Sequence, residues 1–305
     1  MENKEIYFKK IRDDIGIKNI HINEPMNKHT SFRVGGPADI FAAPANIDEL
    51  KSLIAFVKQE GIPMFIIGNG SNLVVKDGGI RGIVINILDN FNNISVKNDI
   101  IEADTGVLLS KLSNVAMKNS LSGLEFASGI PGTLGGAVVM NAGAYGEQIG
   151  DLVVKSEYID MDGTIHELDG NAQKFGYRKS FYSDKKVIVI KAALKLVMSD
   201  MAEIKEKMTN LMLQRNEKQP LAYPSAGSVF KRPEGYFAGK LIEDAGLKGI
   251  IHGGAQISDK HTGFIINRGK ARASDIIHLI EYAKEIVKIK FGVELETEVK
   301  IIGED

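Results

Sequence analysis

The chain of 305 residues contains no cysteine, and this single absence excludes several kinds of chemistry. Without thiols there is no disulfide, no thiolate metal site, no cysteine nucleophile and no cysteinyl link to a cofactor. Any redox chemistry must therefore be carried by a bound cofactor. The sequence also lacks an apolar run of membrane-spanning length, and its polar start, residues 1–14, predicts no signal peptide. We expect a cytoplasmic protein.

An excess of charge of either sign is missing too. The net charge is -1, and basic residues are spread along the chain, so nothing resembles an electrostatic footprint for nucleic acid. The six histidines show neither His-x-x-x-His nor His-Glu-x-x-His spacing, which argues against a metal site. Only His261 is kept as a candidate, because it lies in a polar patch ahead of an apolar strand. We expect small-molecule partners only, no metal, and a monomer or weak oligomer.

Hydrophobic periodicity predicts an α+β protein of two or three domains. Residues 1–26 read as a short amphipathic helix and a connector, and a β-α-β pattern opens the fold. Asp162 and Gly163 mark the turn of a hairpin. The predicted helices are 47–60, 107–120, 202–214, 238–245 and 273–291. The predicted strands are 40–42, 64–67, 82–88, 94–103, 152–161, 164–168, 185–196, 264–267 and 295–302.

The most informative stretch is Glu125–Gly146, EFASGIPGTLGGAVVMNAGAYG, with six glycines and almost no charge. Its backbone can approach a flat or phosphorylated ligand closely, since few side chains hold the ligand away from the N–H groups. A second glycine loop, residues 67–72, lies between two short apolar strands. Taken alone it is equally well explained as a tight turn. Neither loop fits a P-loop or an ordinary Rossmann fingerprint, yet together they indicate a large bound cofactor.

Three further segments place charged or hydroxyl side chains beside glycine or tight turns. Arg178, in FGYRKSF, is suited to a carboxylate or phosphate, although a surface cation explains it as well. Ser228 lies in a small-residue loop followed by two cations, where a hydroxyl can donate a proton to a developing carbanion. Alternation in the terminal strand puts Glu296 and Glu298 on one face, for which a solvated edge strand is the simple explanation. The residues alone leave the reaction open.

These segments, in this order behind the two glycine loops, resemble the UDP-N-acetylenolpyruvoylglucosamine reductase family, in its shorter branch without a Tyr-bearing loop. The resemblance runs from TSFRVGG at residues 30–36 to Glu298 and Val299. It implies the two-subdomain FAD-binding fold of the vanillyl-alcohol-oxidase type followed by a C-terminal α+β substrate-binding domain. We place these domains at 1–92, 93–198 and 199–305.

The resemblance implies a peptidoglycan-precursor enzyme that uses non-covalent FAD and NADPH to reduce the enolpyruvyl group of UDP-N-acetylglucosamine enolpyruvate, giving UDP-N-acetylmuramate. Hydride reaches the terminal enolpyruvyl carbon. Ser228 would then protonate the neighbouring carbanion, while Arg178 and Glu298 would stabilise the enolate-like intermediate. Glu298 can help only if it is protonated or bridged to a cation, so we expect burial to raise its pKa.

Position by position, the resemblance assigns cofactor contacts to the two glycine loops and one upstream arginine. The expected cofactor-binding residues are Arg33, Gly68, Asn69, Gly70, Ser71, Asn72, Ser128, Gly129, Ile130, Pro131, Gly132, Gly135, Gly136, Asn141, Gly143 and Ala144. The expected substrate-binding residues are Tyr177, Arg215, Lys218 and Arg232. For Arg215 and Lys218 a solvated helical face is an equal alternative. Arg232 replaces the Asn of the better-known branch, which leaves the diphosphate-gripping residues open.

Two rival functions depend on other features. One is an oxidase or dehydrogenase of the same flavoprotein fold acting on an alcohol, lactone or hydroxy acid. Many of these attach flavin through His or Cys, whereas neither glycine loop here contains either residue. The other rival is a non-enzymatic flavin- or nucleotide-binding module. The joint presence of Arg178, Ser228 and Glu298 disfavours it, because a pure binder needs no proton donor.

Overall fold

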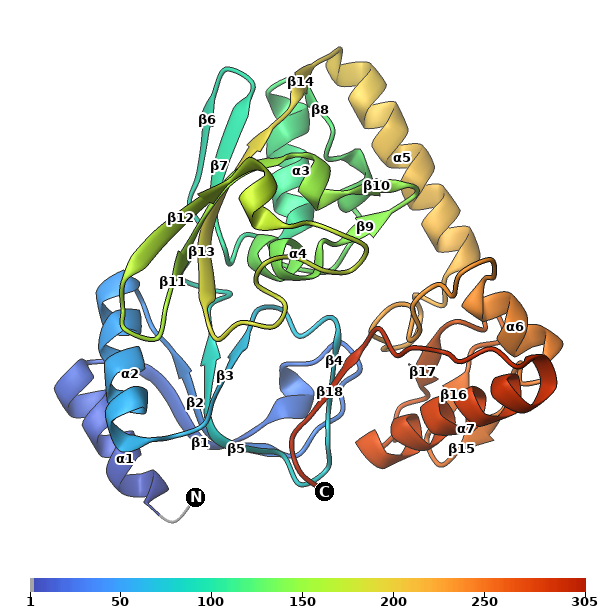
Figure 1. Ribbon diagram of the computed structural model, residues 1–305, viewed down its shortest axis with the longest axis horizontal. Helices are drawn as coiled ribbons and strands as arrows, with labels where there is room; N and C mark the ends of the chain where they lie inside the picture. The colour runs from blue at the N-terminus through green and yellow to red at the C-terminus, as the bar shows by residue number, and fades with distance from the viewer. Residues whose placement is uncertain (1–2) are drawn as a thin grey trace. The chain divides into compact units, whose positions relative to one another are not determined.

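The computed structural model describes residues 3–305, so the first two residues of the predicted N-terminal helical segment and first domain lie outside it. Two compact units form: a first unit of residues 3–22, 40–69 and 82–214, and a second unit of residues 23–39, 70–81 and 215–305. Helices and mostly antiparallel sheets confirm the α+β class (Figure 1). In the described residues no helix has both the length and the hydropathy that a membrane crossing requires.

The predicted elements occur in order, but strand Asn19–Pro25 lies where a connector was predicted, and helix Leu134–Met140 lies in the glycine-rich stretch, where no helix was predicted. The helices are α1 (Lys4–Lys10), α2 (Ile47–Glu60), α3 (Leu109–Lys118), α4 (Leu134–Met140), α5 (Met201–Lys218), α6 (Ala238–Asp244) and α7 (Ala273–Phe291). The strands are β1 (Asn19–Pro25), β2 (Pro37–Ala43), β3 (Met64–Ile67), β4 (Leu73–Val75), β5 (Ile80–Asn86), β6 (Ile94–Lys97), β7 (Ile100–Asp104), β8 (Leu121–Ser122), β9 (Gly143–Ala144), β10 (Glu147–Gln148), β11 (Val153–Ile159), β12 (Ile165–Asp169), β13 (Ile188–Lys195), β14 (Val197–Met198), β15 (Ile251–His252), β16 (Ala255–Ile257), β17 (Ile265–Asn267) and β18 (Lys300–Ile302). Short helical turns are 11–15, 26–28, 125–127, 149–151 and 170–173.

A four-stranded sheet of order β1-β2-β5-β3 opens the fold, with β3 and β5 parallel. Helix α2 begins where Asn46 Oδ1 accepts from Glu49 N, and it ends at Gly61 in the left-handed conformation. Its face carrying Leu50 and Leu53 packs in one core with Ile83 of β5. The predicted helix 47–60 is confirmed.

A five-stranded antiparallel sheet of order β12-β11-β13-β7-β6 follows, and Figure 1 shows its strands side by side. The predicted hairpin is confirmed, with Gly163 at a φ of +79° in the turn. The single strand predicted for 94–103 is wrong. Strands β6 and β7 form a hairpin, because Asn98 adopts a φ of +56° and the chain reverses there.

The glycine-rich stretch is anchored by its apolar members. Phe126, Leu134 and Val138 are buried in one core with Leu112 of α3 and Leu194 of β13. Burial of these side chains fixes the intervening glycines relative to the sheet. The stretch is therefore a packed part of the first unit rather than a loose loop.

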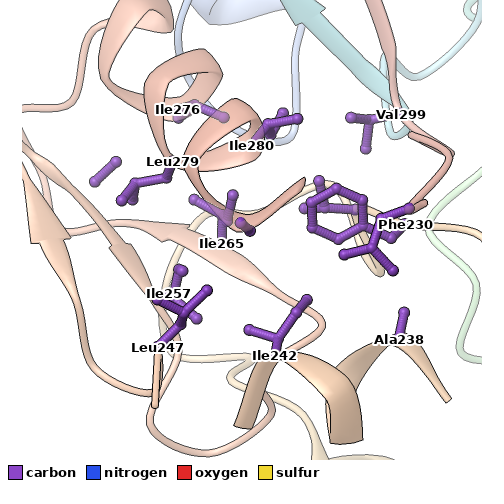
Figure 2. Close-up of a cluster of buried hydrophobic side chains, with 14 of the residues drawn as sticks. Phe230, Ala238, Ile242, Leu247, Ile257, Ile265, Ile276, Leu279, Ile280 and Val299 are labelled. Atoms are coloured by element: carbon purple, nitrogen blue, oxygen red, sulfur yellow. The ribbon is translucent and has the colours of Figure 1, made fainter. Parts of the chain in front are cut away.

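The second unit combines a three-stranded sheet β15-β16-β17 with α6, α7 and the parallel pair β4 and β18. Figure 2 shows its core, in which Ile276 and Ile280 of α7 lie with Ile265 of β17 and with Phe230 and Val299. The predicted helix 273–291 is confirmed, but regular pairing in the predicted strand 295–302 starts only at Lys300. The preceding segment forms an isolated β-bridge, Phe230 to Thr297, with main-chain hydrogen bonds from Lys231 N to Glu296 O and from Glu298 N to Val229 O. The proposed three-domain boundaries stay a prediction.

Candidate functional site

The two glycine loops meet within the first unit. Asn69 Nδ2 donates to Pro131 O at 2.5 Å. A Cβ on Gly68 would lie 2.4 Å from Thr133 Oγ1, so glycine is required there by the protein's own packing. The contacts join two motifs that the sequence separates, and they make one backbone-rich surface.

Helix α4 begins on this surface with Thr133 as its N-cap, whose Oγ1 accepts from Gly136 N at 3.3 Å. Gly135 N donates to Thr105 O at 2.8 Å. A Cβ on Gly135 would lie 1.7 Å from Thr105 Oγ1, a buried hydroxyl that has no hydrogen-bond partner among the described residues. Gly135, like Gly68, is therefore demanded by packing.

Gly136 is different. It is exposed, its φ is ordinary, and the nearest protein atom to a Cβ there is Thr133 Oγ1 at 3.5 Å. Within residues 3–305, the N–H groups of Gly129, Gly132 and Thr133 donate to no protein acceptor. A surface with unused backbone donors and a glycine that packing does not require fits the close approach of FAD.

Asn141 holds the far end of α4 in the left-handed conformation, with a φ of +46° and no exposed surface. Its Nδ2 donates to Gln148 Oε1 at 2.9 Å and to Gly176 O at 2.8 Å, and its Oδ1 accepts from Gly150 N at 2.8 Å. One buried amide thus ties the loop containing β9 to the turn that carries Tyr177 and Arg178.

Arg178 lies in a tight turn closed by reciprocal backbone hydrogen bonds between Gly176 and Lys179. Its φ is +53°, a conformation that costs a non-glycine residue on the order of 1 kcal/mol or more. Its Nη2 donates to Gly143 O at 3.1 Å, and its guanidinium carbon is 5.1 Å from the centre of the exposed Tyr177 ring. Such constraint fixes the direction of the guanidinium fork.

In the second unit, main-chain hydrogen bonds of Val229, the residue after Ser228, connect this segment to Glu298. Val229 N donates to Gly263 O at 2.9 Å, and Val229 O accepts from Glu298 N at 2.7 Å. Ser228 is exposed and Glu298 is half-buried. The fold therefore joins the backbone segments of Ser228 and Glu298, which are far apart in the sequence.

Residues 70–72, in the glycine loop 67–72, lie next to the segment that carries Glu298. Asn72 Nδ2 donates to Glu298 O at 3.1 Å, and Lys300 N donates to Asn72 O at 2.9 Å as β4 and β18 begin to pair. Upstream, Gly70 O accepts from Ser31 N at 3.1 Å, two residues before the exposed Arg33. Arg33 itself sits at a φ of +54°.

The cations that we expect to bind the substrate also lie in the second unit. The Arg232 guanidinium carbon is 4.0 Å from the centre of the exposed Phe237 ring, a stacked arrangement that orients its donors. The neighbouring Lys231 pairs with Glu296 at 2.7 Å. Arg215 is half-buried and Lys218 exposed near the end of α5. In residues 3–305 no three His, Asp or Glu side chains cluster as a metal site would need.

The predicted site residues divide between the units. Gly68, Asn69, residues 128–136, residues 141–144, Tyr177 and Arg178 belong to the first unit, and Arg33, residues 70–72, Arg215, Lys218, Ser228, Arg232 and Glu298 to the second. Sequence reasoning missed the supporting side chains Thr133, Phe237 and Asn267, the last of which donates to Phe32 O at 2.9 Å. Only Thr133 had a signal, an N-cap residue ahead of a helical pattern.

Comparisons with known proteins agree with this geometry. A family model described as an FAD binding domain matches residues 38–169, and one described as the C-terminal domain of UDP-N-acetylenolpyruvoylglucosamine reductase matches residues 219–302. The reductase of that name from Caldanaerobacter subterraneus subsp. tengcongensis is 53% identical over 98% of this chain and 99% of its own. That from Clostridioides difficile is 52% identical over the full length of both.

Solved structures give the same result. The crystal structure of the Thermus caldophilus reductase of that name matches with a TM-score of 0.79 and 34% identity, over 93% of this chain and 98% of that chain. A BBE-like protein from Physcomitrella patens matches with a TM-score of 0.51 and 13% identity, over 63% of this chain and 44% of that one, a likeness of fold alone. The predicted FAD-binding fold with a C-terminal substrate-binding domain is confirmed.

Proposed function

Because the chain belongs to the UDP-N-acetylenolpyruvoylglucosamine reductase family, we propose that it reduces the enolpyruvyl group of UDP-N-acetylglucosamine enolpyruvate to give UDP-N-acetylmuramate, a step of peptidoglycan precursor synthesis. The observation that carries the proposal is that the chain is 53% identical, over 98% of its length, to the reductase from Caldanaerobacter subterraneus subsp. tengcongensis. The family predicted from sequence motifs is thereby confirmed. A cytoplasmic location, and a monomer or weak oligomer, remain our expectations.

FAD, when bound, would supply the hydride-transfer chemistry that connects NADPH with the terminal enolpyruvyl carbon. In the first unit, the backbone groups of 128–136, with Gly68 and Asn69, would hold it, and the family resemblance also assigns Arg33 and residues 70–72 to the cofactor. Support comes from the unused N–H groups of Gly129, Gly132 and Thr133. Asn141, whose amide is occupied by protein partners, is proposed to act as a support, while Gly143 and Ala144 remain proposed cofactor contacts.

Ser228 is proposed as the proton donor to the substrate carbon that becomes carbanionic. Its hydroxyl is exposed, and two cations, Lys231 and Arg232, follow within four residues. Nearby positive charge favours the alkoxide that proton donation leaves behind. Its place beside the backbone of Glu298, through Val229, is what the geometry contributes to the proposal.

Arg178 and Glu298 are proposed to stabilise the enolate-like intermediate. A guanidinium beside a carboxylate that gains charge gives direct electrostatic stabilisation, and the strained turn at Arg178 supports a functional constraint. Glu298 acts in its protonated form or through a cation, because an ionised carboxylate would repel the intermediate. Its half-buried side chain is compatible with that requirement.

The substrate diphosphate is assigned to Arg215, Lys218 and Arg232, with Tyr177 beside the sugar nucleotide. Arginine forks match phosphate geometry, and stacking on Phe237 would keep the Arg232 fork oriented. An alcohol or hydroxy-acid oxidase of the same fold is the rival activity. It would need no proton donor toward a carbanion, so Ser228 separates the two.

An anaerobic absorbance trace of the purified protein tests the proposal. NADPH is added first and UDP-N-acetylglucosamine enolpyruvate second. We expect NADPH to bleach the flavin band and the sugar nucleotide to restore it. Bleaching without recovery would favour the rival activity, and absence of a flavin band after reconstitution with FAD would refute the cofactor assignment.

A further inference from the structure

His261, in the second unit, is half-buried, and its ring packs against a neighbouring aromatic side chain. Its ring meets the Phe264 ring edge to face, with centroids 4.9 Å apart at 64°. Its backbone is fixed as well, since His261 O accepts from Phe264 N at 2.9 Å and His261 N donates to the buried Ser258 Oγ at 3.3 Å. The imidazole therefore has a defined position and orientation.

The ring also makes a specific hydrogen bond. His261 Nδ1 accepts from Gly263 N at 3.1 Å. A ring nitrogen that accepts carries no proton, so the bond assigns the neutral tautomer with hydrogen on Nε2. Burial lowers the pKa of His261 below its ordinary value, which keeps the ring neutral at pH 7.

The Gly263 peptide leads from this ring to both predicted catalytic residues of the second unit. Gly263 O accepts from Val229 N, the residue after Ser228, and Val229 O accepts from Glu298 N. Gly263 is therefore held on its N–H by the imidazole, and its carbonyl, in the following peptide group, accepts from the Ser228–Val229 peptide. Loss of the first bond frees the Gly263 backbone, on which the Ser228–Val229 peptide depends.

Gly263 also leaves space between the side chains of His261 and Ser228. A Cβ at this position would lie 3.0 Å from His261 Cε1 and 3.4 Å from Ser228 Oγ. The imidazole and the hydroxyl thus border the same small volume, which any larger residue would fill.

We propose that His261 is a positioning residue for Ser228: its Nδ1 holds the N–H of Gly263, and the carbonyl of the same residue holds the Ser228–Val229 peptide at the geometry needed for proton donation. The proposal rests on the proposed function, because it takes Ser228 as the proton donor. His261 itself is assigned no contact with substrate or cofactor.

The proposal carries a pH dependence, because a protonated Nδ1 cannot accept from Gly263. The groups packed on the ring, Phe264 together with Gly239 of α6 and Gly263, carry no charge. The charged residues nearby in the chain are engaged elsewhere: Asp259 accepts from Gln256, Lys260 donates to Asn216 O, and Lys240 pairs with Asp244. The Ser228 segment should therefore loosen as pH falls through the folded-state pKa of the ring.

Two variants of the holoenzyme separate the acceptor from the ring. In His261→Asn the side-chain oxygen can accept from the amide two residues later, as in an Asx-turn, and it does not titrate. In His261→Phe the ring volume stays and the acceptor is lost. Stopped-flow traces between pH 5.5 and 8.5 (about the range set by an ordinary His pKa) follow recovery of the flavin band by the sugar nucleotide, and separately its bleaching by NADPH.

We expect His261→Phe to slow recovery about tenfold, equivalent to about 1.4 kcal/mol of barrier, with bleaching within about twofold of wild type. His261→Asn should keep recovery within about threefold and abolish the acid-side decline of the wild type. Unchanged recovery in His261→Phe, or an equal loss in both variants, overturns the proposal. Should His261→Phe fail to fold, the pH profiles of His261→Asn and wild type decide alone.

Amide hydrogen exchange at Gly263, measured by NMR on the holoenzyme without substrate, gives a readout independent of catalysis. Exchange should be about tenfold faster in His261→Phe and near wild type in His261→Asn. Equal exchange in all three proteins refutes the positioning role even if activity changes. A wild-type protein whose flavin band is not restored by the sugar nucleotide refutes the proposed function instead, while leaving the exchange result interpretable.

Discussion

The glycine-rich segment Glu125–Gly146 and the neighbourhood of Ser228 hold their predicted site residues in opposite ways. In the first, the supports are buried side chains of the same stretch, Thr133 at one end of α4 and Asn141 at the other. In the second, Ser228 and Glu298 are joined by main-chain bonds through Val229. A contiguous site carries its own scaffold, whereas an assembled site depends on the pairing of distant segments.

This difference predicts whether a substitution in each region lowers stability or changes only the chemistry. A side chain added to a packed glycine of the first region should damage the scaffold itself. In the second region, removal of a functional side chain should leave the main-chain frame in place and change the chemistry alone. The substitutions below test this contrast.

Ser228→Ala should have the largest effect. Loss of a positioned proton donor typically costs about 10²- to 10⁴-fold in rate, so recovery of the flavin band by the sugar nucleotide should slow by that factor. Bleaching by NADPH should stay within about twofold, because the main-chain bonds of Val229 are untouched. Ser225→Ala, in the same loop, is the matched control and should change neither rate. Equal losses in both half-reactions would contradict the assignment.

Gly135→Ala and its neighbour Gly136→Ala should differ sharply. The Gly135 Cβ would lie 1.7 Å from Thr105 Oγ1, and overpacking of this kind costs about 1–3 kcal/mol, so the melting temperature should fall. Gly136→Ala has room, with 3.5 Å to the nearest atom, and should keep its melting temperature while binding FAD more weakly.

Thermal melts of the apoproteins and FAD titrations by fluorescence measure the two effects. Adding Thr105→Ala to Gly135→Ala should restore part of the lost stability, because the clashing hydroxyl is gone. If Gly136→Ala binds FAD as tightly as wild type, the cofactor does not approach the backbone at that position.

Phe237→Leu should have a smaller effect, confined to substrate affinity. Removing the ring that stacks on Arg232 leaves the charge but frees its orientation, so the KM for the sugar nucleotide should rise about two- to fivefold, with the KM for NADPH unchanged. Arg232→Lys keeps the positive charge but lacks the forked guanidinium, so it should raise the KM for the sugar nucleotide at least as much. Steady-state kinetics with each substrate varied in turn would show a role in NADPH binding if both KM values moved.

The same contrast explains which parts could be predicted from the sequence. Helices 47–60 and 273–291 were predictable because apolar spacing and glycine stops are local signals. The hairpin of β6 and β7 was missed because Asn98 gives a weak turn signal beside continuous apolar residues. The predicted strand 295–302 was too long, since Leu295 and Val299 are buried like strand residues although regular pairing starts only at Lys300.

For the candidate site, motif order predicted the family, but local sequence could not predict what supports each residue. The glycines looked alike in sequence, and only packing separates Gly68 and Gly135, which the protein's own contacts require, from Gly136, which they do not. The bonds from Asn72 to Glu298 and from Gly263 to Val229 depend on tertiary pairing between segments far apart in the chain.

The smallest expected effect is a difference in acid sensitivity between the two regions. Burial alone would raise the pKa of Glu125, but hydrogen bonds from Ser122 Oγ at 2.7 Å and Gly123 N at 2.9 Å, with Lys207 at 3.6 Å, outweigh it and lower the pKa. A lowered carboxyl pKa contributes stability that is present above the ordinary value of 4.5 and lost as pH falls through the folded value.

The lowered pKa of His261 acts in another window: stability falls as pH drops below its ordinary value of 6.5, because the unfolded chain binds the proton more readily. Melting temperatures from pH 3 to 8 (about the span of the two ordinary values) should therefore show Glu125→Gln flattening the profile only at its acid end. His261→Asn should flatten it only in the window just below 6.5. If Glu125→Gln changed the upper window, the two regions would not lose their supports independently, and the contrast between a self-scaffolded and an assembled site would fail.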